Sequence, residues 1–237
     1  MGPAGRVKRF WKAVAAKRGE GGWTIELDGK PLRTPARALL LLPTEQLAGA
    51  IAAEWAAAGE DVDPRAMPMT GLANAAIDHV APDPKAFASG LARYAEADLA
   101  CYRAQGPSAL VEQQAQDWDA LLEWARRRFD VDFTTTSGLA HIAQPPATVE
   151  QLVQQVMQLG PFELAALAPL VTIGGSLVAA LGVIERGISA DQAWASVSLD
   201  ERWQIERWGA DAEAEQALAG RRRDFLAAAR FLALAGD

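Results

Sequence analysis

The most informative stretch of the sequence is L-D-E-R-W-Q-I-E-R-W-G-A-D-A-E-A-E, residues 199–215. It holds two of the chain's eight tryptophans and six of its thirty acidic residues. At about 100° per residue, this pattern predicts a single helix with two apolar faces. Leu199 and Trp203 face one way, and the opposite face carries Ile205, Trp208 and Ala212.

Glu201 falls inside the second apolar face of this predicted helix, with Gln204, Asp211 and Glu215 along its border. A carboxylate is costly to bury alone, so Glu201 needs a cationic or hydrogen-bonding partner. Two interpretations stay open. Glu201 pairs with an arginine of its own chain in a core helix, or the face is kept for another protein.

The length and amino-acid composition are those of a folded globular protein. Its 237 residues are enough for one large domain or two small ones, and 50% are hydrophobic while 22% are charged. The net charge is −7. Binding to nucleic-acid phosphates needs a basic face, so we expect no nucleic-acid partner.

The first eighteen residues are basic although the whole chain is acidic, because they carry six positive charges and no acid. A solvated strand edge explains them best, since lysines deter edge pairing, although an anion or membrane-surface patch is the alternative. The six are Arg6, Lys8, Arg9, Lys12, Lys17 and Arg18.

The compartment is predicted from the single cysteine and from the absence of an apolar leader. Cys101 cannot form an internal disulfide, which indicates a reducing compartment, and we expect a bacterial cytoplasmic location. Cys101 has no clear cationic neighbour that would lower its pKa. A buried structural thiol is therefore favoured over a nucleophile.

Residues 1–83 are predicted to form an N-terminal α+β domain, a small antiparallel sheet with helices. Residues 23–27 alternate in polarity, and Asp28-Gly29 is a strong signal for a type I′ hairpin turn. Thr44 is the expected N-cap of a helix that carries Leu47, Ile51 and Trp55 at helical spacing, and Thr70 is expected to cap the next.

Residues 84–237 are predicted to form an all-α C-terminal domain, so the fold class is α+β overall. Residues 164–184 contain no charge and are long enough to cross a bilayer. Pro169 and the pair Gly174-Gly175 interrupt this run and favour two buried helices instead. We therefore expect no stable membrane insertion.

Catalytic motifs are missing from the sequence. It contains no Gly-x-Ser-x-Gly elbow, His-Glu-x-x-His pair, Walker lysine or cysteine pair, so no catalytic residue, cofactor or metal site is predicted. The alternative is a hydrolase or small-molecule enzyme that uses Glu201, Asp211 and Glu213. On one helix these acids lie at about 200°, 120° and 320°, so they do not share a face.

Several motifs resemble one known family. They are W-Q-x-E-x-W-G-x-D-x-E-A from Trp203, D-F-x-A-A-A-R-F-L from Asp224, and the fifteen-residue run from Gly21 to Pro35. Further matches are Y-A-x-x-D-L-x-C-Y-R-A from Tyr94 and H-x-x-Q-P from His141. This pattern is similar to that of the F-type ATP synthase assembly chaperones that act on the α subunit of the catalytic sector, in mitochondria and alphaproteobacteria.

The resemblance covers roughly residues 8–234 and implies a molecular chaperone rather than an enzyme. Such a protein would bind the unassembled α subunit and shield its interface until a β subunit replaces it. Eukaryotic relatives would work in the mitochondrial matrix, and we expect a monomeric chaperone. On the helix of residues 199–215, an apolar face edged by charge suits this role. The expected partner-binding residues are Glu201, Gln204, Ile205, Trp208, Asp211 and Glu215.

Overall fold

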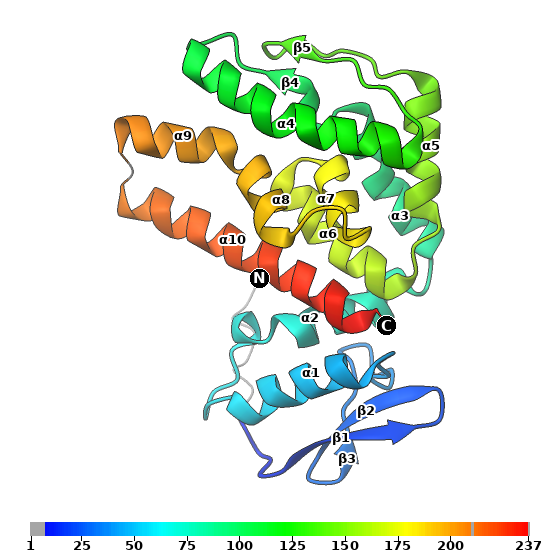
Figure 1. Cartoon of the computed structure of the whole chain (residues 1–237). Coiled ribbons are helices and arrows are strands. Elements are labelled where there is room, and N and C mark those ends of the chain that lie inside the picture. Colours follow the sequence, from blue (N-terminus) through cyan, green and yellow to red (C-terminus); the bar gives the residue numbers. More distant parts are fainter. Residues whose placement is uncertain (1–7, 210, 237) are drawn as a thin grey trace. The chain divides into compact units, whose positions relative to one another are not determined.

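The computed structural model describes residues 8–209 and 211–236, so Arg6 of the basic segment lies outside the described residues. The chain divides into two compact units. The first comprises residues up to Asp83 together with 161–166 and 230–237, and the second comprises 84–160 and 167–229. Figure 1 shows the sheet in the first unit and the helices of both.

The sheet of the first unit is antiparallel with the order β1-β2-β3, where β1 is Val14–Gly19, β2 is Gly22–Leu27 and β3 is Lys30–Pro31. Asp28 (φ 49°) and Gly29 (φ 78°) join β2 to β3 with positive φ at both positions, which confirms the predicted turn. The Asp28 carboxylate accepts hydrogen bonds from the backbone N–H groups of Ala13 and Lys12. These bonds hold the pKa of Asp28 below its usual value.

One helix of the first unit packs on this sheet. Helix α1 (Glu45–Ala57) contacts β1 and β2 and buries Leu47 and Ile51 completely. Thr44 is its N-cap, as predicted, because its hydroxyl accepts from the N–H of Leu47. The short helices η1 (Pro64–Ala66), α2 (Pro68–Ala75) and η2 (Ala76–Val80) follow.

The predicted N-cap role of Thr70 is wrong. Pro68 starts α2 two residues earlier, because proline suits the first turn of a helix, where no N–H partner is needed. Thr70 lies inside the helix, and its hydroxyl donates to Glu54 Oε2 at 2.7 Å. The same carboxylate also accepts from the N–H groups of Met69 and Thr70, so Glu54 satisfies the helix start.

Two segments distant in sequence complete the first unit. Phe162, at the start of α6 (Pro161–Gly174), stacks on Phe231 near the end of α10 (Ala212–Ala235) with ring centroids 6.0 Å apart. The Thr44 hydroxyl donates to the carbonyl of Leu234. The N-cap of α1 is therefore also a contact with the C-terminal helix.

The second unit is mainly helical, with a buried core that includes Trp118, Leu122, Leu152 and Phe225. A two-stranded parallel pair, β4 (Tyr102–Arg103) with β5 (Thr136–Ser137), is added to the helices. The remaining elements are α3 (Pro84–Ala92), η3 (Arg93–Glu96), η4 (Leu99–Cys101), α4 (Ser108–Phe129), α5 (Pro146–Met157), α7 (Leu177–Ile184), α8 (Ala190–Val197) and α9 (Leu199–Trp208).

The uncharged run is divided between α6 and α7, as predicted. Gly175 has a φ of +68°, and Ser176 then caps α7 by accepting from the N–H of Ala179. Asp98 is buried at this break and accepts from Ser176 Oγ at 2.8 Å and from the N–H of Val178 at 2.9 Å. Within the described ranges, no helix combines the length and the apolar character that crossing a membrane requires.

Candidate functional site

The stretch 199–215 is two helices and not the single helix predicted. α9 ends at Trp208, because Gly209 takes a φ of +75° that a helix cannot continue. Asp211 then acts as an N-cap for α10, with its Oδ1 accepting from the N–H of Ala214 at 2.7 Å. The predicted angular positions of Asp211 and Glu213 relative to Glu201 are therefore wrong.

The start of α9 is firmly held by the helix before it and by α4. Leu199 is buried, and the Ser198 hydroxyl donates to the carbonyl of Trp194 at 2.6 Å. Arg202 reaches back to the Ala195 carbonyl at 2.8 Å. On the other side, Gln114 Nε2 in α4 donates to Asp200 Oδ1 at 2.7 Å.

Glu201 pairs with an arginine of its own chain, which is the first of the two interpretations left open by the sequence. Its Oε1 lies 2.7 Å from the guanidinium nitrogen Nη2 of Arg221 in α10, and both side chains are 42% exposed. The helix is not a core helix, however. Of its ten residues, only Leu199 is buried.

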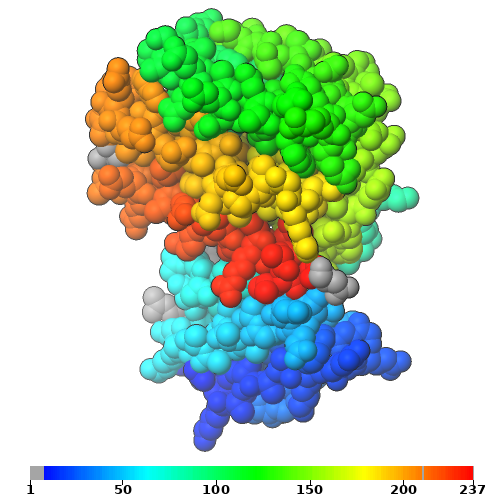
Figure 2. Space-filling model, viewed as in Figure 1, coloured from blue at the N-terminus to red at the C-terminus, as the bar shows by residue number. Residues whose placement is uncertain are grey.

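The end of α9 presents an exposed aromatic cluster. Trp208 is 72% exposed and meets Trp203 edge to face, with ring centroids 5.4 Å apart. The guanidinium of Arg207 lies over the Trp203 ring at 5.7 Å from its centroid. Figure 2 shows α9 and the start of α10, in orange tones, at the surface of the second unit.

A groove of about 460 Å³ lies between α8, α9 and α10. Its apolar lining includes Trp194, Ile205 and Leu218, and its charged lining includes Asp191 and Arg222, which form an ion pair at 2.9 Å. Glu215 also lines it. Ile205, predicted to share a face with Trp208, thus points into a groove while Trp208 faces solvent.

The six predicted partner-binding residues therefore fall into three groups. Ile205 and Glu215 line the groove, and Glu201 is held by Arg221. Gln204, Trp208 and Asp211 are exposed around the end of α9. All six lie on α9, on the start of α10 or on the connection between them.

The cysteine and two of the acids that could have carried catalysis in the second unit have structural contacts. Cys101 is completely buried, and burial raises the pKa of its thiol to about 12, which keeps it protonated. Among the described residues, no group of three or more His, Cys, Asp and Glu side chains is arranged to hold a metal ion. Glu201 and Asp211, two acids of the enzyme alternative, have an ion pair and an N-cap as their contacts.

Sequence reasoning missed the residues that place this surface. Gln114 and Arg221 were not predicted to contact α9, and they lie 86 and 20 residues from their partners. No spacing rule connects positions so far apart on different helices. The W-G-A-D run could have shown the helix break, since glycine ends helices and aspartate starts them.

The exposed aromatic and acidic side chains at the end of α9 are of the kind that proteins use to bind other proteins. The chain belongs to the ATP12 chaperone protein family, whose model matches residues 8–126. The family places the chain among chaperones of ATP synthase assembly.

Relatives support this placement across nearly the whole chain. The protein atp12, mitochondrial, of Schizosaccharomyces pombe is 26% identical over 226 residues, covering 90% of this chain and 78% of that protein. The crystal structure of Atp12 from Paracoccus denitrificans is 45% identical, with a TM-score of 0.91 over 97% of this chain and 98% of that one. An aspartate-to-lysine mutant of the Paracoccus protein matches equally well, with a TM-score of 0.91 and 44% identity over the same shares.

Proposed function

We propose that this chain binds the unassembled α subunit of F-type ATP synthase and covers its assembly interface until the β subunit replaces the chaperone. The contact surface would be α9 and the start of α10. The observation that carries this proposal is Trp208, which is 72% exposed within a highly acidic segment. A large exposed aromatic side chain is typical of binding sites and costly to leave in water.

The charges around Trp208 favour a basic partner surface. Residues 199–215 contain six acids and two arginines. Both arginines are engaged by the chain itself, since Arg202 donates to the Ala195 carbonyl and Arg207 lies over the Trp203 ring. A partner with an apolar socket rimmed by lysine or arginine would match Trp208 and the exposed acids near it.

Binding of this kind needs neither catalysis nor nucleotide. An isolated subunit of a hetero-oligomeric ring exposes the apolar surface that its neighbour will cover, and such surfaces aggregate. The chaperone lowers that risk by occupying the surface reversibly. We therefore propose a non-enzymatic, monomeric protein that acts in the bacterial cytoplasm.

The test is a pull-down with separately produced α and β subunits of the cognate ATP synthase. We expect the chain to capture α and not β, and to keep α monomeric and free of aggregates in light scattering. Equal capture of both subunits would indicate a general holding chaperone. Capture of β alone, or of neither subunit, would contradict the proposal.

A further inference from the structure

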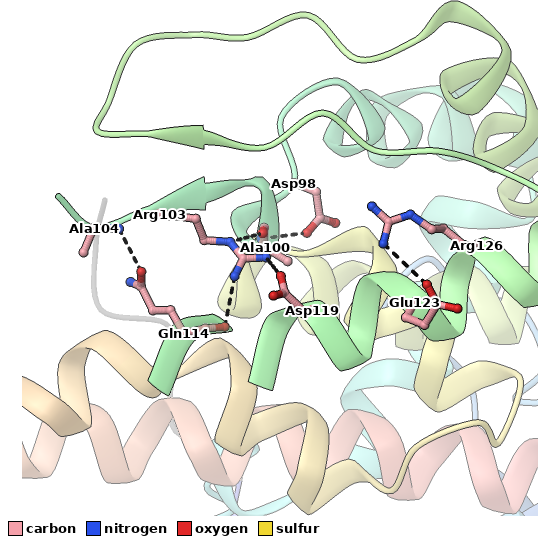
Figure 3. A network of polar contacts seen from close by, with 8 residues as sticks. All are labelled: Asp98, Ala100, Arg103, Ala104, Gln114, Asp119, Glu123 and Arg126. Carbon is pink, nitrogen blue, oxygen red and sulfur yellow. Dashed lines mark hydrogen bonds and ion pairs between the residues drawn. The ribbon is translucent and has the colours of Figure 1, made fainter. Parts of the chain in front are cut away.

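Gln114 is a buried amide that connects two separate segments of the second unit to α4. It is 1% exposed. Its Oε1 accepts from the backbone N–H of Ala104 at 2.8 Å, and its Nε2 donates to Asp200 Oδ1 at 2.7 Å. Figure 3 shows the Gln114 side chain reaching toward Ala104 beside the Arg103 network.

Arg103 fixes the loop that Gln114 contacts. Its guanidinium donates to the carbonyl of Ala100 at 3.0 Å, to the carbonyl of Gln114 at 3.1 Å and to Asp119 Oδ1 at 2.8 Å. It also lies over the ring of Trp118, 5.4 Å from the centroid. The backbone and the side chain of Gln114 are therefore both held on the side of residues 100–104, as Figure 3 shows.

On its other side, Gln114 meets the first turn of α9. Asp200 is next to Glu201, and the bond from Gln114 is a contact between α4 and the acidic end of the proposed client surface. A hydrogen bond to a charged acceptor is stronger than one between neutral groups and fixes orientation as well as distance. Small displacements of a binding helix are costly, because complementary contacts are lost together.

We propose that Gln114 is a positioning residue for client binding, which sets the orientation of α9 through Asp200. This inference rests on the proposed function. The Gln114 amide accepts from Ala104 and donates to Asp200 at the same time, which neither an ionised carboxylate nor an apolar side chain can do. Glutamate at position 114 would set two carboxylates against each other, and an apolar side chain would leave the N–H of Ala104 without its acceptor.

A charge-swap experiment tests the proposal. Gln114→Glu is expected to weaken α-subunit binding at least about tenfold, the effect of losing a charged hydrogen bond. Asp200→Asn keeps an acceptor for Gln114, so its α9 should keep its amide protection, and its binding is the reference level for the double variant. In the double variant, the carboxylate introduced at position 114 can accept from both Ala104 and the amide introduced at position 200, so binding is expected to return.

A second measurement and a matched control variant separate a positioning role of Gln114 from general damage to the fold. Hydrogen exchange of the free chain should show α9 amides losing protection in Gln114→Glu and regaining it in the double variant. Gln116→Glu, the same change at an exposed position of α4, is the matched control and should alter neither readout. These readouts report on α9 itself rather than on overall folding.

Specific outcomes would overturn the proposal. Unchanged binding and unchanged α9 protection in Gln114→Glu would overturn it. A double variant that fails to bind or leaves α9 unprotected, although Asp200→Asn binds, would overturn it too. If the unmodified chain captured no α subunit, the proposed function would fail. The hydrogen-exchange pattern would then still decide whether Gln114 positions α9.

Discussion

The carboxylate of Glu201 in α9 lies 2.7 Å from the guanidinium of Arg221 in α10, and each side chain is 42% exposed. An ion pair with this much solvent contact stabilises a fold by less than about 1 kcal/mol. The pair therefore orients Glu201 more than it holds the two helices together. Nearly half of the Glu201 side chain stays open to a partner.

Glu201→Lys is expected to leave the fold intact and to abolish capture of the α subunit. Reversing the charge sets two cations against each other at an exposed site, which we expect to cost about 1 kcal/mol of unfolding free energy or less. It also removes an acid from the surface proposed to meet a basic partner. Thermal unfolding and the α-subunit pull-down measure the two effects.

Arg221→Glu combined with Glu201→Lys is the control for this variant. The double variant restores an ion pair with the charges exchanged, so its stability should return toward that of the unmodified chain. Capture should stay lost, because the acid itself is missing from α9. Recovered capture would show that Glu201 acts only through Arg221.

Trp208→Ala is expected to weaken α-subunit binding at least about thirtyfold, as the loss of an aromatic hot spot does. Its effect on unfolding should stay below about 1.5 kcal/mol, because the ring is 72% exposed and meets Trp203 edge to face. Isothermal titration and denaturant unfolding would measure both. Phe10→Ala is a matched control, because Phe10 is 74% exposed and meets Trp11 edge to face at 5.2 Å. Equal loss of binding in both variants would contradict a specific role for Trp208.

Gly187→Ala is expected to destabilise the chain by about 1–3 kcal/mol, the usual cost of overpacking. A Cβ at this position would lie 2.3 Å from Trp124 Nε1 and 2.4 Å from Cε2, well inside contact distance. Gly90→Ala should have the opposite effect on stability, because Gly90 lies in α3 and a Cβ added there would meet no atom within 4 Å beyond its chain neighbours and its own helix backbone. There alanine should stabilise by about 0.5–1 kcal/mol. Urea unfolding of both variants measures the difference, and equal shifts would refute it.

Asp98 should make stability depend on pH with a defined sign. Burial raises the pKa of this carboxyl above its usual value, and hydrogen bonds from Val178, Ala100 and Ser176 offset only part of that cost. Because the pKa of Asp98 is raised in the folded state, its protonated carboxyl adds to the unfolding free energy below the ordinary pKa of aspartate. This added stability is lost as the pH rises through the raised pKa. The unfolding free energy of the unmodified chain should therefore fall, relative to Asp98→Asn, as the pH rises from about 4. A relative increase with pH would contradict this sign.

Local sequence signals predicted much of the fold. The Asp28-Gly29 turn, the Thr44 N-cap and the interrupted run between α6 and α7 all depend on residues close together in the chain. Such preferences act through backbone φ values and hydrogen bonds between nearby residues, so they can be predicted from the sequence alone. The division into β-rich and helical parts follows from the same patterns.

The candidate site was predictable only in part. The six residues lie on α9, on the start of α10 or between them, but the break at Gly209 separates Asp211 and Glu215 from the helix that carries Glu201. One glycine within a helical pattern is often tolerated, so its positive φ was not foreseen. The contact between Gln114 and Asp200 joins residues 86 apart, and tertiary packing alone creates it.

The pairing of Phe162 with Phe231, and of Thr44 with the Leu234 carbonyl, bears on how this protein is made. The sheet and α1 leave the ribosome before the second unit, yet residues 230–236, which complete the first unit, are translated after the whole of the second unit. Domains generally fold as they emerge during synthesis. Here the first unit cannot form all of its contacts until residues 230–236 are synthesised. A nascent chain stalled before α10 would therefore expose an incomplete N-terminal core.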